Sequence, residues 1–166
     1  FSDLGLSPAI LDAVTEQVLK MEAKSIVLNL VDNVTIKGQT SAYAAENITI
    51  NGNDKTLTFS DSYRTYIKTA GGKVVLNNVN VSRQSTGGTH WHDNNMKFSS
   101  DVEMNNVTFD KGITINEVKA VLNNVTITKN KVATYGLFIV CGSNVEMDDC
   151  KITHADGVAG RGIKVV

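Results

Sequence analysis

The chain has 166 residues, a formal net charge of −1 and 16 Lys and Arg residues. This length suits one hydrophobic core, and we expect a single domain over residues 1–166. The basic residues are scattered rather than gathered into the stripe that a nucleic-acid partner requires, and no apolar run approaches the roughly 20 residues that cross a bilayer. These features exclude nucleic-acid binding and a membrane-spanning helix. Nucleotide-binding motifs are absent, and we expect no cofactor.

Residues 1–24 differ from the rest and predict an N-terminal helical cap. Ser7 followed by Pro8 is typical of a helix N-cap and first turn. Apolar residues then recur at helical spacing and predict an amphipathic helix over about residues 8–22. These apolar residues are Ile10, Leu11, Val14, Val18 and Met21. We expect this face to cover the apolar end of the first coil, which would otherwise expose unpaired strand edges.

From residue 25 to residue 166 the sequence predicts coils of short strands. The early strand candidates, which are less regular, are residues 25–30, 33–36, 47–50 and 55–59. Four later segments align without gaps: residues 74–81, 102–109, 120–127 and 145–152. Each reads apolar, any residue, apolar, Asn/Asp, Asn/Asp, apolar, any residue, apolar. A second, glycine-led repeat covers residues 112–115, 136–139 and 162–165. Because alternate strand residues point to opposite faces, each coil is expected to have three strands with apolar residues inward.

The repeat predicts two inward stacks and one polar corner. The stacks are Leu76, Met104, Leu122 and Met147, and then Val79, Val107, Val125 and Cys150. The corner leaves room only for the Asn-Asn pair, and Asn tolerates a left-handed backbone better than other residues except Gly. We therefore interpret Asn78, Asn106 and Asn124 as corner residues whose side chains form a hydrogen-bonded ladder. In the fourth segment Asp148 and Asp149 take the place of the Asn-Asn pair.

Over residues 25–166 this pattern resembles the right-handed parallel β-helix superfamily of pectate lyases and polygalacturonases, in which a short Asn-bearing turn separates the second and third strands. The resemblance implies an all-β fold, a right-handed parallel β-helix (β-solenoid) of about five to six coils closed by the N-terminal helix. It implies architecture rather than activity, because the superfamily includes lyases, hydrolases, adhesins and phage proteins.

The resemblance also implies that a catalytic site would project outward from the first strand of each coil. The predicted outward row is Lys68, Lys97, Thr114, Phe138 and Lys164. It contains no carboxylate, whereas a calcium-dependent lyase needs converging Asp or Glu oxygens and a glycosidase needs a carboxyl pair. Asp148, Asp149, His154 and residues 161–164 are similar to polygalacturonase motifs, but Asp148 and Asp149 fall at the Asn corner, on the other side of the coil. We therefore predict no catalytic residue.

The longest insertion contains the most unusual cluster of side chains. His90 and His92 would lie on one side of an extended segment, with Asp93 beside them, a set that suits a transition metal. Trp91 could stack on a sugar ring. No further ligand can be assigned, so no metal is predicted, and a polar surface loop with a half-buried Trp is the simpler interpretation. The predicted ligand-binding residues are His90, Trp91, His92, Asp93, Lys97 and Lys68.

These patterns favour a secreted or cell-surface β-helix module that binds a polysaccharide or other glycan, or acts as an adhesin, without catalysis. The alternatives are a polysaccharide lyase or glycoside hydrolase, and a structural spacer within a larger solenoid. Residues 161–166 match the start of a new coil that no cap follows. An end-to-end homodimer, cover by residues outside this chain and continuation of a longer chain all stay open. A Cys141–Cys150 disulfide stays open as well.

Overall fold

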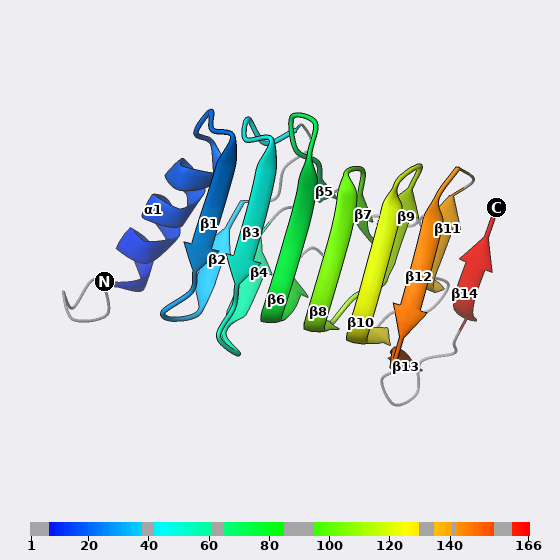
Figure 1. The fold of residues 1–166 in the computed structure, drawn as a ribbon. Coiled ribbons are helices and arrows are strands. Elements are labelled where there is room, and N and C mark those ends of the chain that lie inside the picture. Colours follow the sequence, from blue (N-terminus) through cyan, green and yellow to red (C-terminus); the bar gives the residue numbers. More distant parts are fainter. Residues whose placement is uncertain are drawn as a thin grey trace.

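The computed structural model describes residues 7–37, 42–60, 65–84, 95–129, 135–140, 142–154 and 161–166. These residues form a parallel β-solenoid of about five turns (Figure 1). Helix α1 (Pro8–Leu19) lies at one end of the stack and strand β14 (Arg161–Val165) at the other. The solenoid predicted from the Asn-Asn repeat is confirmed. In the described part of the chain, no helix has the length and apolar character needed to span a bilayer.

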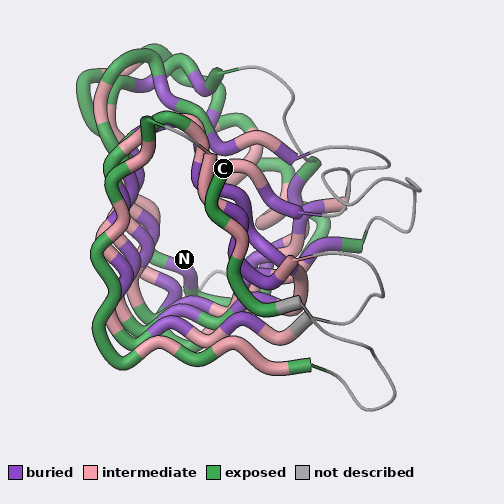
Figure 2. Tube along the Cα trace, turned by 90° about the vertical axis from the view of Figure 1, so that its right-hand side faces the viewer, coloured by how far each residue is buried: buried purple, intermediate pink, exposed green. Residues whose placement is uncertain are grey.

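Two parallel sheets enclose the core and give the solenoid three faces. The first face is the five-stranded sheet of β5 (Tyr66–Ile67), β7 (Met96–Phe98), β9 (Ile113–Asn116), β11 (Tyr135–Val140) and β14. The nine-stranded sheet forms the other two faces with β1 (Ser25–Asn29), β2 (Val34–Ile36), β3 (Asn47–Asn51), β4 (Thr56–Phe59), β6 (Lys73–Arg83), β8 (Asp101–Phe109), β10 (Lys119–Lys129), β12 (Asn144–Asp148) and β13 (Lys151–His154). Figure 2, which looks along the stack, shows how the chain encircles one interior.

The two predicted inward stacks are present and lie in the core except at the C-terminal coil, where Met147 is 39% exposed. Leu76 pairs with Met104, Met104 with Leu122, and Leu122 with Met147. In the second stack Val79, Val107 and Val125 pair in the same way and are buried. Cys150 is half-buried against this core and carries a free thiol, while Cys141 lies outside the described residues.

The polar corner lies between the second and third faces, where β6, β8 and β10 each turn. Asn78, Asn106 and Asn124 have φ angles of 49°, 55° and 51°. Asn106 Nδ2 donates to Asn78 Oδ1 at 2.9 Å, and Asn124 Nδ2 donates to Asn106 Oδ1 at 2.8 Å. A parallel ladder runs through Asn29, Asn51, Asn77, Asn105 and Asn123. The prediction of left-handed corner residues joined by a ladder is confirmed.

The N-terminal helix is present, but only part of its predicted apolar face is buried: Val18 packs against the core and Leu11 is half-buried. Ile10, Val14 and Met21 are exposed, at 47%, 48% and 57%, and the helix ends at Leu19, which is buried. A polar contact explains how the helix is oriented. Asp12 Oδ1 accepts a hydrogen bond from the backbone N–H of Thr35 in β2 at 2.7 Å. The edge of the first coil has backbone donors that need an acceptor, so Asp12 faces that edge and part of the apolar stripe stays exposed.

Candidate functional site

The five-stranded sheet presents one outward row of side chains from successive coils. Strand pairing places in this row Tyr66, Lys97, Thr114, Phe138 and Lys164. The prediction that Lys68 occupies the first position is wrong, because Tyr66 pairs with Lys97. Ile67 points inward and is buried, so both of its neighbours face outward, and alternation alone does not show which of them aligns with Lys97. Lys68 lies two residues further along, on the same face.

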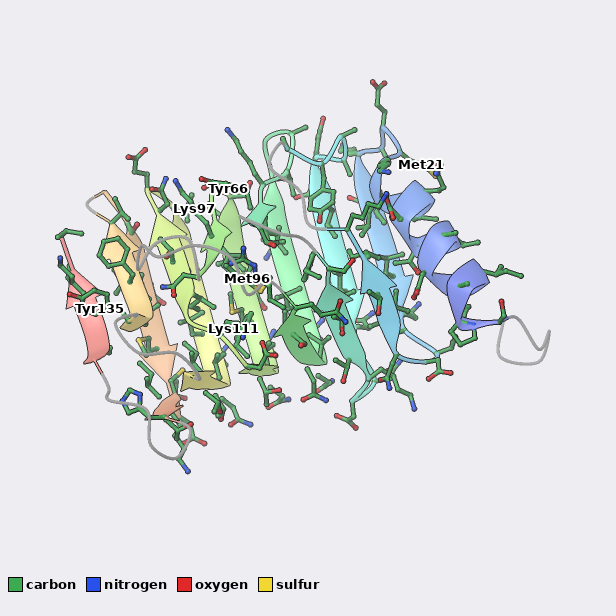
Figure 3. The ribbon with its side chains drawn as sticks, turned by 180° about the vertical axis from the view of Figure 1, so that it is seen from behind. Met21, Tyr66, Met96, Lys97, Lys111 and Tyr135 are labelled. Atoms are coloured by element: carbon green, nitrogen blue, oxygen red, sulfur yellow. The ribbon has the colours of Figure 1, made fainter. Side chains whose placement is uncertain are left out.

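The row combines aromatic rings with ammonium groups. Lys97 Nζ lies 5.2 Å from the centre of the Tyr66 ring, and Figure 3 shows these two side chains close together. In the last coils Lys164 Nζ lies 5.4 Å from the Tyr135 ring and 5.7 Å from the Phe138 ring. These two rings stack with their centres 5.9 Å apart. Such cation–π contacts hold each lysine against a flat apolar surface while its charge stays available to a ligand.

Three adjoining hollows run along this face and its edge. The first hollow has a volume of about 240 Å³ and is lined by Thr65, Tyr66, Asn95, Lys97, Thr114, Asn116, Phe138 and Val140. The second, of about 440 Å³, shares Tyr66, Lys97 and Asn116 with the first and adds Lys68 and Glu117. The third, of about 460 Å³, shares Lys68 with the second. Because neighbouring hollows share lining residues, together they form one groove.

The floor of the first hollow is polar and recessed. Asn95 and Thr114 face outward, yet they are only 2% and 6% exposed. Asn95 Nδ2 donates to the backbone oxygen of Ile113 at 3.2 Å and to Thr114 Oγ1 at 3.3 Å. Asn95 Oδ1 is buried and has no hydrogen-bond partner. Thr114 belongs to the predicted outward row, but Asn95 and the burial of both side chains were not predicted, because residue spacing does not mark an outward position as buried.

Glu117 stands at the rim of the second hollow with an unusual backbone. Its φ angle is 58°, in the left-handed region that favours Gly and Asn. Its backbone N–H donates to Ser143 Oγ at 2.8 Å, which holds the turn that follows β9. The side chain is exposed and shares the hollow with Lys68 and Lys97. This carboxylate could not be predicted from the repeat, because it lies beyond the strand and outside the predicted row.

The structure brings together two of the predicted ligand-binding residues. Lys68 and Lys97 line the second hollow. The other four, His90, Trp91, His92 and Asp93, lie outside the described residues. Asp148 and His154 end β12 and β13 of the nine-stranded sheet, away from the groove. Within the described ranges, no three His, Cys, Asp or Glu side chains form a group that could hold a metal ion.

Comparisons with known proteins assign no family to this chain. No protein-family model, no curated protein and no solved structure matches it. The fold and the groove are therefore the basis on which its function can be inferred.

Proposed function

We propose that this chain is a glycan-binding β-solenoid module that holds its ligand, without catalysis, along the outward face of the five-stranded sheet. The observation that carries the proposal is the row in which Tyr66, Lys97, Phe138 and Lys164 come from successive or nearby coils. Sugar rings have apolar faces that stack on aromatic rings, while their polar edges take hydrogen bonds. Adjacent coils repeat at about 4.8 Å, so an extended glycan could contact several of them.

The lysines favour an acidic glycan. Lys68 and Lys97 line one hollow, and Glu117 is the only carboxylate among its described lining residues. An ammonium group forms stronger hydrogen bonds with a carboxylate or sulfate than with a neutral hydroxyl. A pectate-lyase-like relationship and a location outside the cell or on its surface are parts of the same proposal, because acidic polysaccharides are abundant there.

One observation favours a polysaccharide lyase as the second candidate. Glu117 combines a left-handed backbone with a place beside two lysines, and backbone strain often occurs at functional sites. The other carboxylate along the groove, Asp101, lines a different hollow and accepts a hydrogen bond from the backbone N–H of Lys119. A lyase would release unsaturated products from polygalacturonate and lose this activity in Glu117→Gln. Binding without such products supports the non-catalytic module.

Affinity electrophoresis tests the proposal with a matched control. Gels that contain polygalacturonate, heparin or neutral xyloglucan are compared for the wild type and the double variant Lys68→Ala/Lys97→Ala. We expect an acidic polymer to retard the wild type, and the double variant to lose this retardation. The control Lys37→Ala/Lys151→Ala removes two exposed lysines that line none of the three hollows, and it changes the net charge equally. Equal losses in both variants, or no retardation by any polymer, would contradict the proposal, and the second result would favour a structural spacer.

A further inference from the structure

Three strands at the end of the stack opposite α1 each have one open edge (Figure 1). β12 and β13 pair with β10, and β14 pairs with β11. Their other edges pair with no strand in the described part of the chain. We propose that this end binds the same end of a second copy of the chain, with the two copies related by a two-fold axis. The inference goes beyond the proposed glycan binding and does not depend on it.

The open end is apolar and accessible. Met147 in β12 is 39% exposed, and Ile163 and Val165 in β14 are 52% and 68% exposed. Strand pairing places all three in the inward stacks of the solenoid, in register with core residues of the preceding coil. A further layer of strands would bury them and pair the open edges, and exposed edges of this kind recruit a partner strand.

The shape of the end selects one arrangement of the two copies. Each coil climbs one strand spacing, about 4.8 Å, over its three faces, so β12, β13 and β14 form three steps of rising height. When two such ends meet across a two-fold axis with the middle step, β13, facing its own copy, the lowest step, β12, faces the highest step, β14, of the second copy. All three gaps are then equal. If β12 or β14 faced its own copy instead, the gaps would differ by one full strand spacing.

The apolar side chains of β12 and β14 fit this arrangement. The two-fold axis makes facing strands antiparallel, and the inward residues of both strands must stay inward. Among the registers that meet these conditions, one covers all three exposed residues. It places Met147 opposite Ile163 of the second copy and Val145 opposite Val165 of the second copy.

The same register brings opposite charges together. Glu146 stands between Val145 and Met147 on the outward side of β12, and it falls opposite Lys164 of the second copy. Glu146 Oε1 already lies 3.8 Å from Lys119 Nζ in its own chain, so the junction places this carboxylate between two ammonium groups. Opposite charges on facing strands stabilise their pairing. The contact occurs twice, because a two-fold interface uses the same residues on both copies.

Sedimentation velocity of the full chain at micromolar concentrations tests the proposal. The wild type should sediment as a dimer. Val165→Asp should raise the dissociation constant about ten-fold or more, because it places a charge in the apolar junction. Val14→Asp is the matched control, since Val14 is 48% exposed but lies on α1 at the other end of the stack. It should leave the dimer unchanged, and circular dichroism checks that both variants are folded.

The outcomes separate this interface from others. A monomeric wild type, or a dimer that folded Val165→Asp leaves intact, would overturn the proposal. Filaments that grow with concentration and are lost in Val14→Asp would also overturn it, because they would show that the open end binds α1 of the next copy, a contact that does not close.

Charge reversal tests the register of β12 against β14. Glu146→Lys and Lys164→Glu should each weaken the dimer, because each sets like charges opposite one another. The double variant Glu146→Lys/Lys164→Glu places opposite charges in both contacts again and should regain most of the wild-type affinity. If the single variants dimerise as the wild type does, or if the double variant regains nothing, the pairing of β12 with β14 is overturned.

Discussion

The polar corner and the outward face are both rows of polar residues on successive coils, but they use their hydrogen-bonding groups differently. At the corner, Asn78, Asn106 and Asn124 pair with one another, so each coil satisfies the next. On the outward face Asn95 Oδ1 has no partner. A residue repeated in register can bond to its own copy one coil away, whereas a row of different residues leaves groups for a ligand. We infer that repetition marks the stabilising region and irregularity the binding region.

The largest effect is expected in the core beneath both regions. Leu122 is fully buried, and Leu122→Ala should lower the free energy of unfolding by about 2–5 kcal/mol, because it leaves a cavity in a close-packed interior. Urea unfolding measures the change. Val121→Ala is the control, since Val121 is a half-buried neighbour in the same strand and should change stability far less. A similar loss in both variants would show that the assigned inward stack is not the one that stabilises the fold.

The corner should show the next largest effect. Asn106 has a φ angle of 55° and makes ladder bonds to both neighbouring coils. Asn106→Ala should lower the free energy of unfolding by about 1–3 kcal/mol, through left-handed strain and lost hydrogen bonds. Asn106→Gly removes the same hydrogen bonds, but Gly adopts a positive φ without strain. The free energy of unfolding should therefore fall less in Asn106→Gly than in Asn106→Ala. If the two variants were equal, backbone conformation would contribute nothing at this corner.

At the end of the ladder, where Asp148 replaces Asn, a substitution should raise the free energy of unfolding rather than lower it. Each ladder amide donates toward the preceding coil, and Asn123 pairs in register with Asp148. An ionised carboxylate has no proton to donate, so the ladder ends there. Asp148→Asn should raise the free energy of unfolding by about 0.5–1.5 kcal/mol, the contribution of one added hydrogen bond.

Asp110→Asn is the matched control for this change. The Asp110 carboxylate already accepts bonds from Ser82 Oγ and from the backbone N–H of Arg83. The same chemical change should therefore destabilise the protein at this position. Destabilisation by both variants would contradict the directional ladder.

The smallest effect concerns a surface ion pair near the ladder. The hydrogen bond from Lys73, followed by that from Asn105, holds the pKa of Glu103 below its usual value. This carboxylate therefore contributes stability above its unfolded pKa, and the contribution is lost as the pH falls through its lower folded pKa. NMR titration of Lys73→Met should show the pKa of Glu103 rising, with a stability change under about 1 kcal/mol because the pair is exposed. An unchanged pKa would show that the pair does not persist in solution.

The sequence predicted the repeated parts of the molecule well. Asn78, Asn106 and Asn124 revealed the register, because a tight corner accepts few residue types and the stacked coils repeat it. From these corners the alternation of apolar residues fixed the inward stacks, including the pairing of Leu122 with Met147.

The sequence predicted the irregular parts less well. Alternation alone could not choose between Tyr66 and Lys68, which face the same side. It could not show that Asn95 is buried, because that depends on tertiary packing around an outward position. The exposure of part of the helix face was missed because Asp12 satisfies a backbone donor of the first coil, a requirement that hydrophobic periodicity does not record.

One paired measurement tests most directly whether the corner carries stability and the outward face carries binding. Unfolding free energy and trigalacturonate affinity are measured together for Asn106→Ala and Lys97→Ala. We expect Asn106→Ala to lower stability while the folded protein keeps its affinity. Lys97→Ala should weaken binding about ten-fold with stability changed by less than about 0.5 kcal/mol. Unchanged affinity in Lys97→Ala, together with lost affinity in folded Asn106→Ala, would contradict this division and move the binding site to the corner.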